Sequence, residues 1–196
     1  MVDLEAMTGV TLRASIDHER MGVLRRLVQA ATVREILMGA QDNLTNVLAV
    51  VLGVTIGAGR ADFVALAGLS AGIAESVSMG GVLYNATRAE HQMAALAGTP
   101  SVAGDASRLT PVFSGLVTFA ASLIAGLVPL FPFALLPVSS AILVSMGLSV
   151  VGLFVLGSVT GRVAGGGWAT EGFRLVAVAG IAAVAAAAVG AAMRVG

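Results

Sequence analysis

The chain has 196 residues, of which 57% are hydrophobic and only 11% are charged, and its formal net charge at pH 7 is zero. Soluble domains carry about 25% charged residues, so this composition predicts an integral membrane protein with one domain. The chain offers no basic tract for phosphate groups, which argues against a nucleic-acid partner. It has no cysteine, so disulfides and thiolate metal sites are excluded.

Residues 1–34 are expected to form a cytoplasmic segment before a membrane domain at residues 35–196. Within the segment, residues 11–31 place apolar side chains in a stripe at helical spacing, and the arginines fall largely outside that stripe. This stretch is too polar to cross a bilayer. It predicts an amphipathic helix that lies along the headgroups or packs beneath the transmembrane bundle.

Five apolar runs are long enough to cross a bilayer, which takes about 20 helical residues. They cover residues 36–58, 62–84, 111–131, 135–160 and 173–193. Prolines separate the third run from the fourth, because proline interrupts a helix. The predicted fold class is therefore an all-α integral membrane protein with five transmembrane helices and an N-terminal amphipathic helix.

The arginines predict the orientation in the membrane. With a cytoplasmic N-terminus, nine of the eleven arginines fall in cytoplasmic segments, and only Arg60 and Arg194 fall outside. This bias favours a cytoplasmic N-terminus and, with five spans, an external C-terminus. The short, arginine-rich chain fits a prokaryotic inner membrane, with a vacuolar-type membrane as the alternative.

Two carboxylates interrupt the first two spans. Asp42 lies about 9 Å into the first span from its cytoplasmic end, and Glu75 lies about 13 Å from the same side in the second. A charged side chain in a span is costly and marks a functional site by default. Because their depths match on neighbouring antiparallel helices, Asp42 and Glu75 are predicted to share one site.

The spacing of methionines adds ligands to this site. Met38 and Asp42 are four residues apart and share a helix face, as do Glu75 and Met79. Carboxylates bind divalent cations, and a thioether shifts the preference towards first-row transition ions. Asn46, one turn beyond Asp42, could add a carbonyl oxygen. Since carboxylates must lose their protons to bind metal, the hypothesis is proton-coupled metal exchange.

Alternatives remain open at these positions. A methionine in an apolar helix can serve packing alone, and Asp42 could pair with Arg34 or bond to another helix. The second hypothesis is therefore a non-transporting membrane scaffold or partner-binding subunit. Glycines four residues apart, such as Gly53 and Gly57, allow close helix packing within a subunit or across a dimer. An enzyme is not expected, because no nucleophile–base set or phosphate loop is present.

Two stretches carry a family resemblance: G-A-Q-D-N-L-T-N-V-L-A-V-V-L-G-V and A-L-A-G-L-S-A-G-I-A-E-S-V-S-M-G-G-V-L-Y. They resemble the vacuolar iron transporter family, which includes nodulin-like members, with its aspartate followed by G-L-T-T and its later S-M pair. The resemblance implies five spans, a homodimer with the first spans at its interface, and export of Fe²⁺ or Mn²⁺ from the cytoplasm in exchange for protons. Asp42 and Met79 carry over as ligands of the transported ion, with no permanently bound cofactor.

The sequence departs from the family pattern at three places. Asn43 and Asn46 replace the usual glycine and threonine. The usual carboxylate after the S-M pair is absent, and Glu75 precedes the pair instead. A long glutamate-rich insert is also missing, because the second and third spans are joined only by residues 85–110. In that connection Glu90 and His91 could catch ions at the mouth of the pathway, or could simply be solvated residues.

Overall fold

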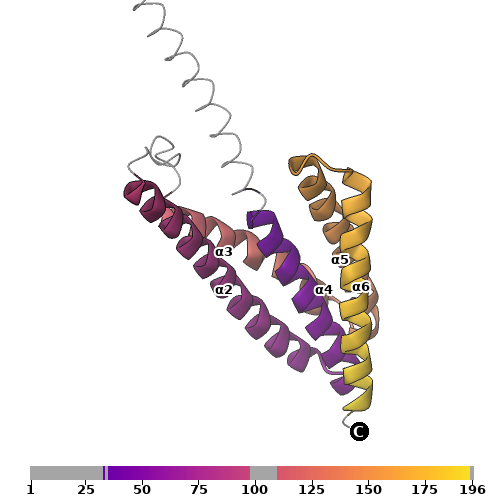
Figure 1. Cartoon of the computed structure of the whole chain (residues 1–196). Helices are drawn as coiled ribbons and strands as arrows, with labels where there is room; N and C mark the ends of the chain where they lie inside the picture. The colour runs from indigo at the N-terminus through magenta and orange to yellow at the C-terminus, as the bar shows by residue number, and fades with distance from the viewer. Residues whose placement is uncertain (1–32, 34, 98–109, 195–196) are drawn as a thin grey trace, which may run out of the picture.

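The computed structural model describes residues 33, 35–97 and 110–194 (Figure 1). The amphipathic helix predicted at residues 11–31 lies outside the described residues, as does nearly all of the predicted segment 1–34. The described chain begins with a helix at Glu35–Ala58, called the first helix below. It continues with α2 (Ala61–Leu96), α3 (Pro111–Leu127), α4 (Phe131–Leu135), α5 (Val138–Val163) and α6 (Trp168–Ala192). The regular structure of the described residues is helical throughout, which confirms the all-α prediction for them.

Four of these helices are long and apolar enough to cross a membrane: the first helix, α2, α5 and α6. The outward faces of α2, α5 and α6 are apolar, with Leu66, Leu143 and Ile181 respectively 67%, 70% and 73% exposed. So large an apolar surface marks contact with lipid rather than with water. The chain is therefore an integral membrane protein.

The third predicted span, 111–131, is shorter in the structure. Helix α3 has 17 residues and ends at Leu127, so at 1.5 Å per residue it is about 26 Å long, against about 30 Å of hydrocarbon. It stops there because Pro129 and Pro132 cannot donate the backbone hydrogen bonds that would continue it. A tight turn and the short helix α4 follow. The count of five spans stays a prediction.

Helix α2 is longer than its predicted span, 62–84. It continues for twelve residues beyond Tyr84, to Leu96, which adds about 18 Å of helix. This extension carries Glu90 and His91. The fourth predicted span, 135–160, corresponds to α5 at Val138–Val163, shifted by three residues at each end. Helix α6 begins at Trp168 instead of residue 173, directly after a turn in which Gly165 adopts a left-handed φ of 74°.

The first helix lies at the centre of the bundle, with the α2–α3 pair on one side and the α5–α6 pair on the other (Figure 1). Its apolar stretch is 44% buried, against 11% for α6. One face contributes Leu44 to a core cluster with Leu153 of α5, and another contributes Val47 to a cluster with Val64 of α2. Both halves of the bundle are therefore positioned by the first helix.

Glycines bring the backbones of these helices together. A Cβ atom at Gly53 would lie 3.1 Å from the carbonyl oxygen of Ala186, and one at Gly57 would lie 3.1 Å from that of Gly190. The glycine pair of the first helix thus packs against α6 within one chain. On the other side, a Cβ atom at Gly80 of α2 would lie 2.9 Å from the carbonyl oxygen of Gly115 of α3. These helices touch backbone to backbone.

Candidate functional site

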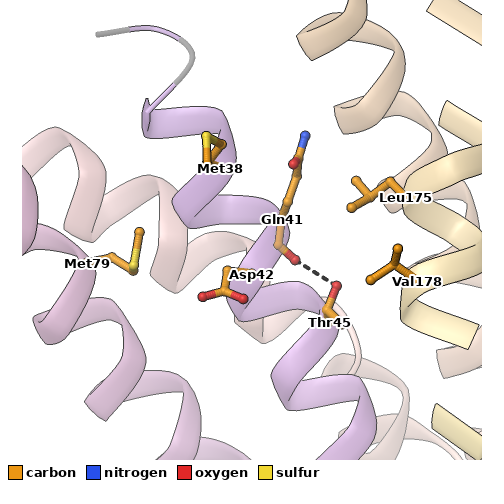
Figure 2. A pocket seen from close by; sticks show the side chains of 7 residues that line it. All are labelled: Met38, Gln41, Asp42, Thr45, Met79, Leu175 and Val178. Carbon is orange, nitrogen blue, oxygen red and sulfur yellow. Dashed lines mark hydrogen bonds between the residues drawn. The ribbon is translucent and has the colours of Figure 1, made fainter. Parts of the chain in front are cut away.

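A pocket of about 350 Å³ lies beside the first helix, between α2 and α6. Four of its lining residues come from successive turns of one side of the first helix, and the others come from α2 and α6. The lining residues are Met38, Gln41, Asp42, Thr45, Met79, Leu175 and Val178. Figure 2 shows Asp42 directed towards the Met79 side of the pocket, while Gln41 and Thr45 lie towards Leu175 and Val178. Three predicted site residues, Met38, Asp42 and Met79, therefore meet at one pocket.

Glu75 and Asn46 lie beside this pocket without being among its lining residues. The side chain of Glu75 is within interaction distance of both Asp42 and Asn46. Two neighbouring carboxylates repel each other unless a proton or a cation lies between them. The arrangement of Asp42, Glu75 and Asn46 can therefore hold a positive charge.

The site is open on the surface of the single chain. Asp42 and Asn46 are exposed, Met38 is 47% exposed, and Glu75 and Met79 are half-buried. In the described part of the chain, no three or more side chains of His, Cys, Asp or Glu are gathered as a metal-ligand group. A divalent ion bound here would therefore need the methionine sulfurs and amide oxygens as well as the two carboxylates.

Gln41 connects the pocket to α5. Its side-chain nitrogen donates a hydrogen bond to the hydroxyl of Thr160, at 2.6 Å, and that hydroxyl donates to the carbonyl oxygen of Leu156. On the first helix itself, the hydroxyl of Thr45 donates to the backbone oxygen of Gln41 (Figure 2). The pocket wall is thus fixed on one side by a direct link between the first helix and α5.

A family model described as VIT family matches residues 33–99 and 93–191 of the chain. The chain belongs to the VIT family. This confirms the resemblance inferred from the two motifs. Members of this family are membrane transporters of metal ions, and the chain is therefore a transporter of this broad class. The two matched segments overlap at residues 93–99, where α2 ends and the short connection to α3 begins. A search of curated proteins found no match.

Glu90 of this VIT-family chain is not part of the pocket. It is exposed on the extension of α2, fifteen residues beyond Glu75, and so about 22 Å away along the helix axis. The neighbouring His91 is half-buried, and its Nε2 atom is buried without a hydrogen-bond partner. The structure therefore separates Glu90 from the other predicted ligands. Glu90 lies near the C-terminal end of α2, which is on the same side of the bundle as the start of the first helix (Figure 1).

Sequence reasoning did not identify Leu175 and Val178 as pocket residues, because an apolar side chain on a membrane helix gives the same signal whether it faces lipid or a pocket. It also noted Asn43 only as a departure from the family pattern. In the structure Asn43 is fully buried and bonded to two other helices. The sequence did carry a signal for this burial, since an amide in an apolar helix is costly unless it finds hydrogen-bond partners.

Proposed function

We propose that this VIT-family chain exports Fe²⁺ or Mn²⁺ from the cytoplasm in exchange for protons. The observation that carries the proposal is the meeting of Asp42 and Met79, from different helices, at one pocket with Glu75 beside Asp42. These side chains combine negative charge with a soft sulfur ligand. The transported ion is the substrate, and no resident cofactor is part of the proposal.

Each residue has a chemical role in this proposal. Asp42 and Glu75 supply the anionic oxygens, and Met79 supplies the thioether that favours first-row transition ions over Mg²⁺ and Ca²⁺. Met38 and Asn46 act as helpers, through a second sulfur and an amide oxygen. Glu90 lies apart, at the proposed cytoplasmic end of α2, and would attract ions to the entrance of the pathway.

The two carboxylates also support the coupling to protons. A divalent ion binds only when Asp42 and Glu75 are deprotonated, so metal and protons compete for the same oxygens. When the metal leaves, the two neighbouring carboxylates favour the return of a proton, because their charges repel each other. Alternate occupation by metal and protons from opposite sides of the membrane would produce exchange.

The open site fits the proposed homodimer. Met38, Asp42 and Asn46 are exposed on the first helix of the single chain, and a second copy placed against this face would bring its own first helix to the pathway. The proposed subunit has five spans, with α3, its turn and α4 forming the third crossing. It lies in a prokaryotic inner membrane, with the N-terminus in the cytoplasm and the C-terminus outside.

The decisive experiment uses proteoliposomes that contain a metal-sensing dye and a pH dye. Fe²⁺ or Mn²⁺ flux with opposite proton movement, present for the wild type and lost for Asp42→Asn, is the expected result. The Asp42→Asn protein should keep its oligomeric state and helical content. If the well-folded wild type moves no divalent ion, the transporter proposal is wrong and a membrane scaffold becomes the better interpretation.

A further inference from the structure

Asn43 is the most enclosed polar side chain of the first helix. It is 0% exposed, although it lies in the middle of an apolar bundle where an unbonded amide is costly. Its neighbour in the chain, Asp42, is exposed at the pocket. Successive residues of a helix point about 100° apart, so the two side chains leave the first helix in different directions.

The amide nitrogen of Asn43 lies among acceptors from two helices. From α2, the carbonyl oxygen of Gly72 is 3.1 Å away and the hydroxyl of Ser76 is 2.9 Å away. From α3, the carbonyl oxygen of Ser122 is 2.8 Å away and its hydroxyl is 3.1 Å away. The nitrogen has two hydrogens, so it can bond to both helices at once. Because backbone carbonyl oxygens only accept hydrogen bonds, they also fix which end of the amide faces them.

Two glycines shape the space that the amide occupies. A Cβ atom at Gly126 of α3 would lie 2.8 Å from both the nitrogen and the oxygen of the Asn43 side chain. A Cβ atom at Gly72 of α2 would lie 3.8 Å from the oxygen. The contact with Gly126 leaves no room for a larger residue. The amide is therefore held by packing as well as by hydrogen bonds.

These contacts set the position of the carboxylates. Asn43 follows Asp42 in the first helix, and Ser76 follows Glu75 in α2, so the Asn43–Ser76 hydrogen bond joins the residues next to the two carboxylates. A slip of one residue between the helices would move Asp42 by about 1.5 Å along the axis and rotate it by about 100°. A bond that prevents this slip keeps Asp42 beside Glu75.

We propose that Asn43 is a positioning residue for metal transport, which clamps the first helix to α2 and α3 and thereby holds Asp42 beside Glu75. The expected effect on the KM for Fe²⁺ rests on the proposed transport function. The clamp between the helices can be tested without any transport. Outer residues that orient metal ligands typically affect metal affinity or activity by roughly 10- to 100-fold. We expect an effect of this size on the KM for Fe²⁺ when Asn43 is replaced by leucine, which has a similar shape and no donor.

The geometric test uses introduced cysteine pairs, because the chain has no cysteine of its own. A Cβ atom at Gly39 would lie 3.5 Å from the Cβ of Met79, within the usual range for a disulfide. The pair Gly39→Cys with Met79→Cys thus reports the register between the first helix and α2 beside the site. A control pair, Gly53→Cys with Ala186→Cys, has a corresponding distance of 3.7 Å and reports the contact of the first helix with α6.

In full-length protein carrying Asn43→Leu, oxidation of the reporter pair should slow by roughly tenfold or more, while the control pair oxidises at its usual rate. Equal slowing of both pairs would overturn the proposal, because that is the behaviour of a residue that only supports the fold. Unchanged oxidation of both pairs would overturn it as well. If Asn43→Leu does not fold, Gly126→Ala gives the same test, since its Cβ atom must displace the amide.

The second part of the test measures transport by variants that carry no introduced cysteines. Asn43→Leu should raise the KM for Fe²⁺ by roughly 10- to 100-fold. The matched control is Ser145→Ala, which removes another buried hydrogen bond, from the Ser145 hydroxyl to the carbonyl oxygen of Pro129, and should leave KM unchanged. An unchanged KM in Asn43→Leu, with an active wild type, would overturn the positioning role. An inactive wild type would refute the proposed function instead, while the cysteine pairs would still report on the clamp.

Discussion

Replacing Gly126 with alanine measures how tightly the Asn43 amide is enclosed. The added Cβ atom would lie 2.8 Å from the side-chain nitrogen and oxygen of Asn43, whereas ordinary contacts begin at 3.4 Å. The amide must therefore move by about 0.6 Å, and overpacking of this kind costs about 1–3 kcal/mol of unfolding free energy. Asn43→Ala alone should also cost about 1–3 kcal/mol, because buried acceptors on α2 and α3 lose their donor.

The double variant distinguishes a direct clash from a general weakening. With alanine at position 43, the added Cβ of Gly126→Ala meets no amide, so the overpacking cost should disappear. The two changes should then show an interaction energy of about 1–3 kcal/mol, in the range of residues in contact. Reversible unfolding in mixtures of SDS and mild detergent gives the unfolding free energy of the wild type, the two single variants and the double variant. Additive effects within about 0.5 kcal/mol would refute the contact between Asn43 and Gly126.

Three further predictions use other contacts of the first helix. Gly190→Ala should lower the unfolding free energy by about 1–3 kcal/mol in the same assay, because its Cβ atom would collide with the carbonyl oxygen of Gly53; an unchanged stability would contradict the close packing with α6. Gln41→Leu should lower the unfolding free energy by about 1 kcal/mol, and adding Thr160→Val to it should lower the unfolding free energy no further. Additive losses from the two changes would show that their hydrogen bond is not the cause. Met79→Leu should lower the preference for Fe²⁺ over Mg²⁺ in dye-based uptake, and an unchanged preference would remove the thioether from the proposed ligands.

The boundaries of the helices show where sequence reasoning succeeds and where it fails. Hydropathy predicts the end of the second span at Tyr84, where apolar residues stop, but a helix does not have to end at the membrane surface. The next twelve residues contain neither glycine nor proline, and many are good helix formers, so α2 continues to Leu96. The shortening of α3 was open to prediction, since Pro129 lies inside the proposed span 111–131 and Pro132 follows directly after it.

The candidate site was predictable to the extent that depth and periodicity determine it. Asp42, Met38 and Met79 meet at one pocket because four-residue spacing places two of them on one helix face and matching depth brings the third near. The contribution of Leu175 from α6 was not predictable, because the packing partner of an apolar helix face is decided by glycine contacts far along the chain. Which of the adjacent side chains of Asp42 and Asn43 would be buried was not predictable either, since rotation about the helix axis is set by tertiary packing.

The different surroundings of Asp42 and Asn43 support a final prediction, which concerns charge. Carbonyl oxygens of Gly72 and Ser122 surround position 43, and they can accept hydrogen bonds from an amide but repel a carboxylate. Asn43→Asp has almost the same shape as the wild type, yet it buries an unpaired charge and should be less stable than Asn43→Leu at neutral pH, by several kcal/mol. Unfolding in detergent compares the two proteins directly. If the aspartate variant is the more stable one, the carbonyl oxygens do not enclose this position, and the clamp must act through packing alone.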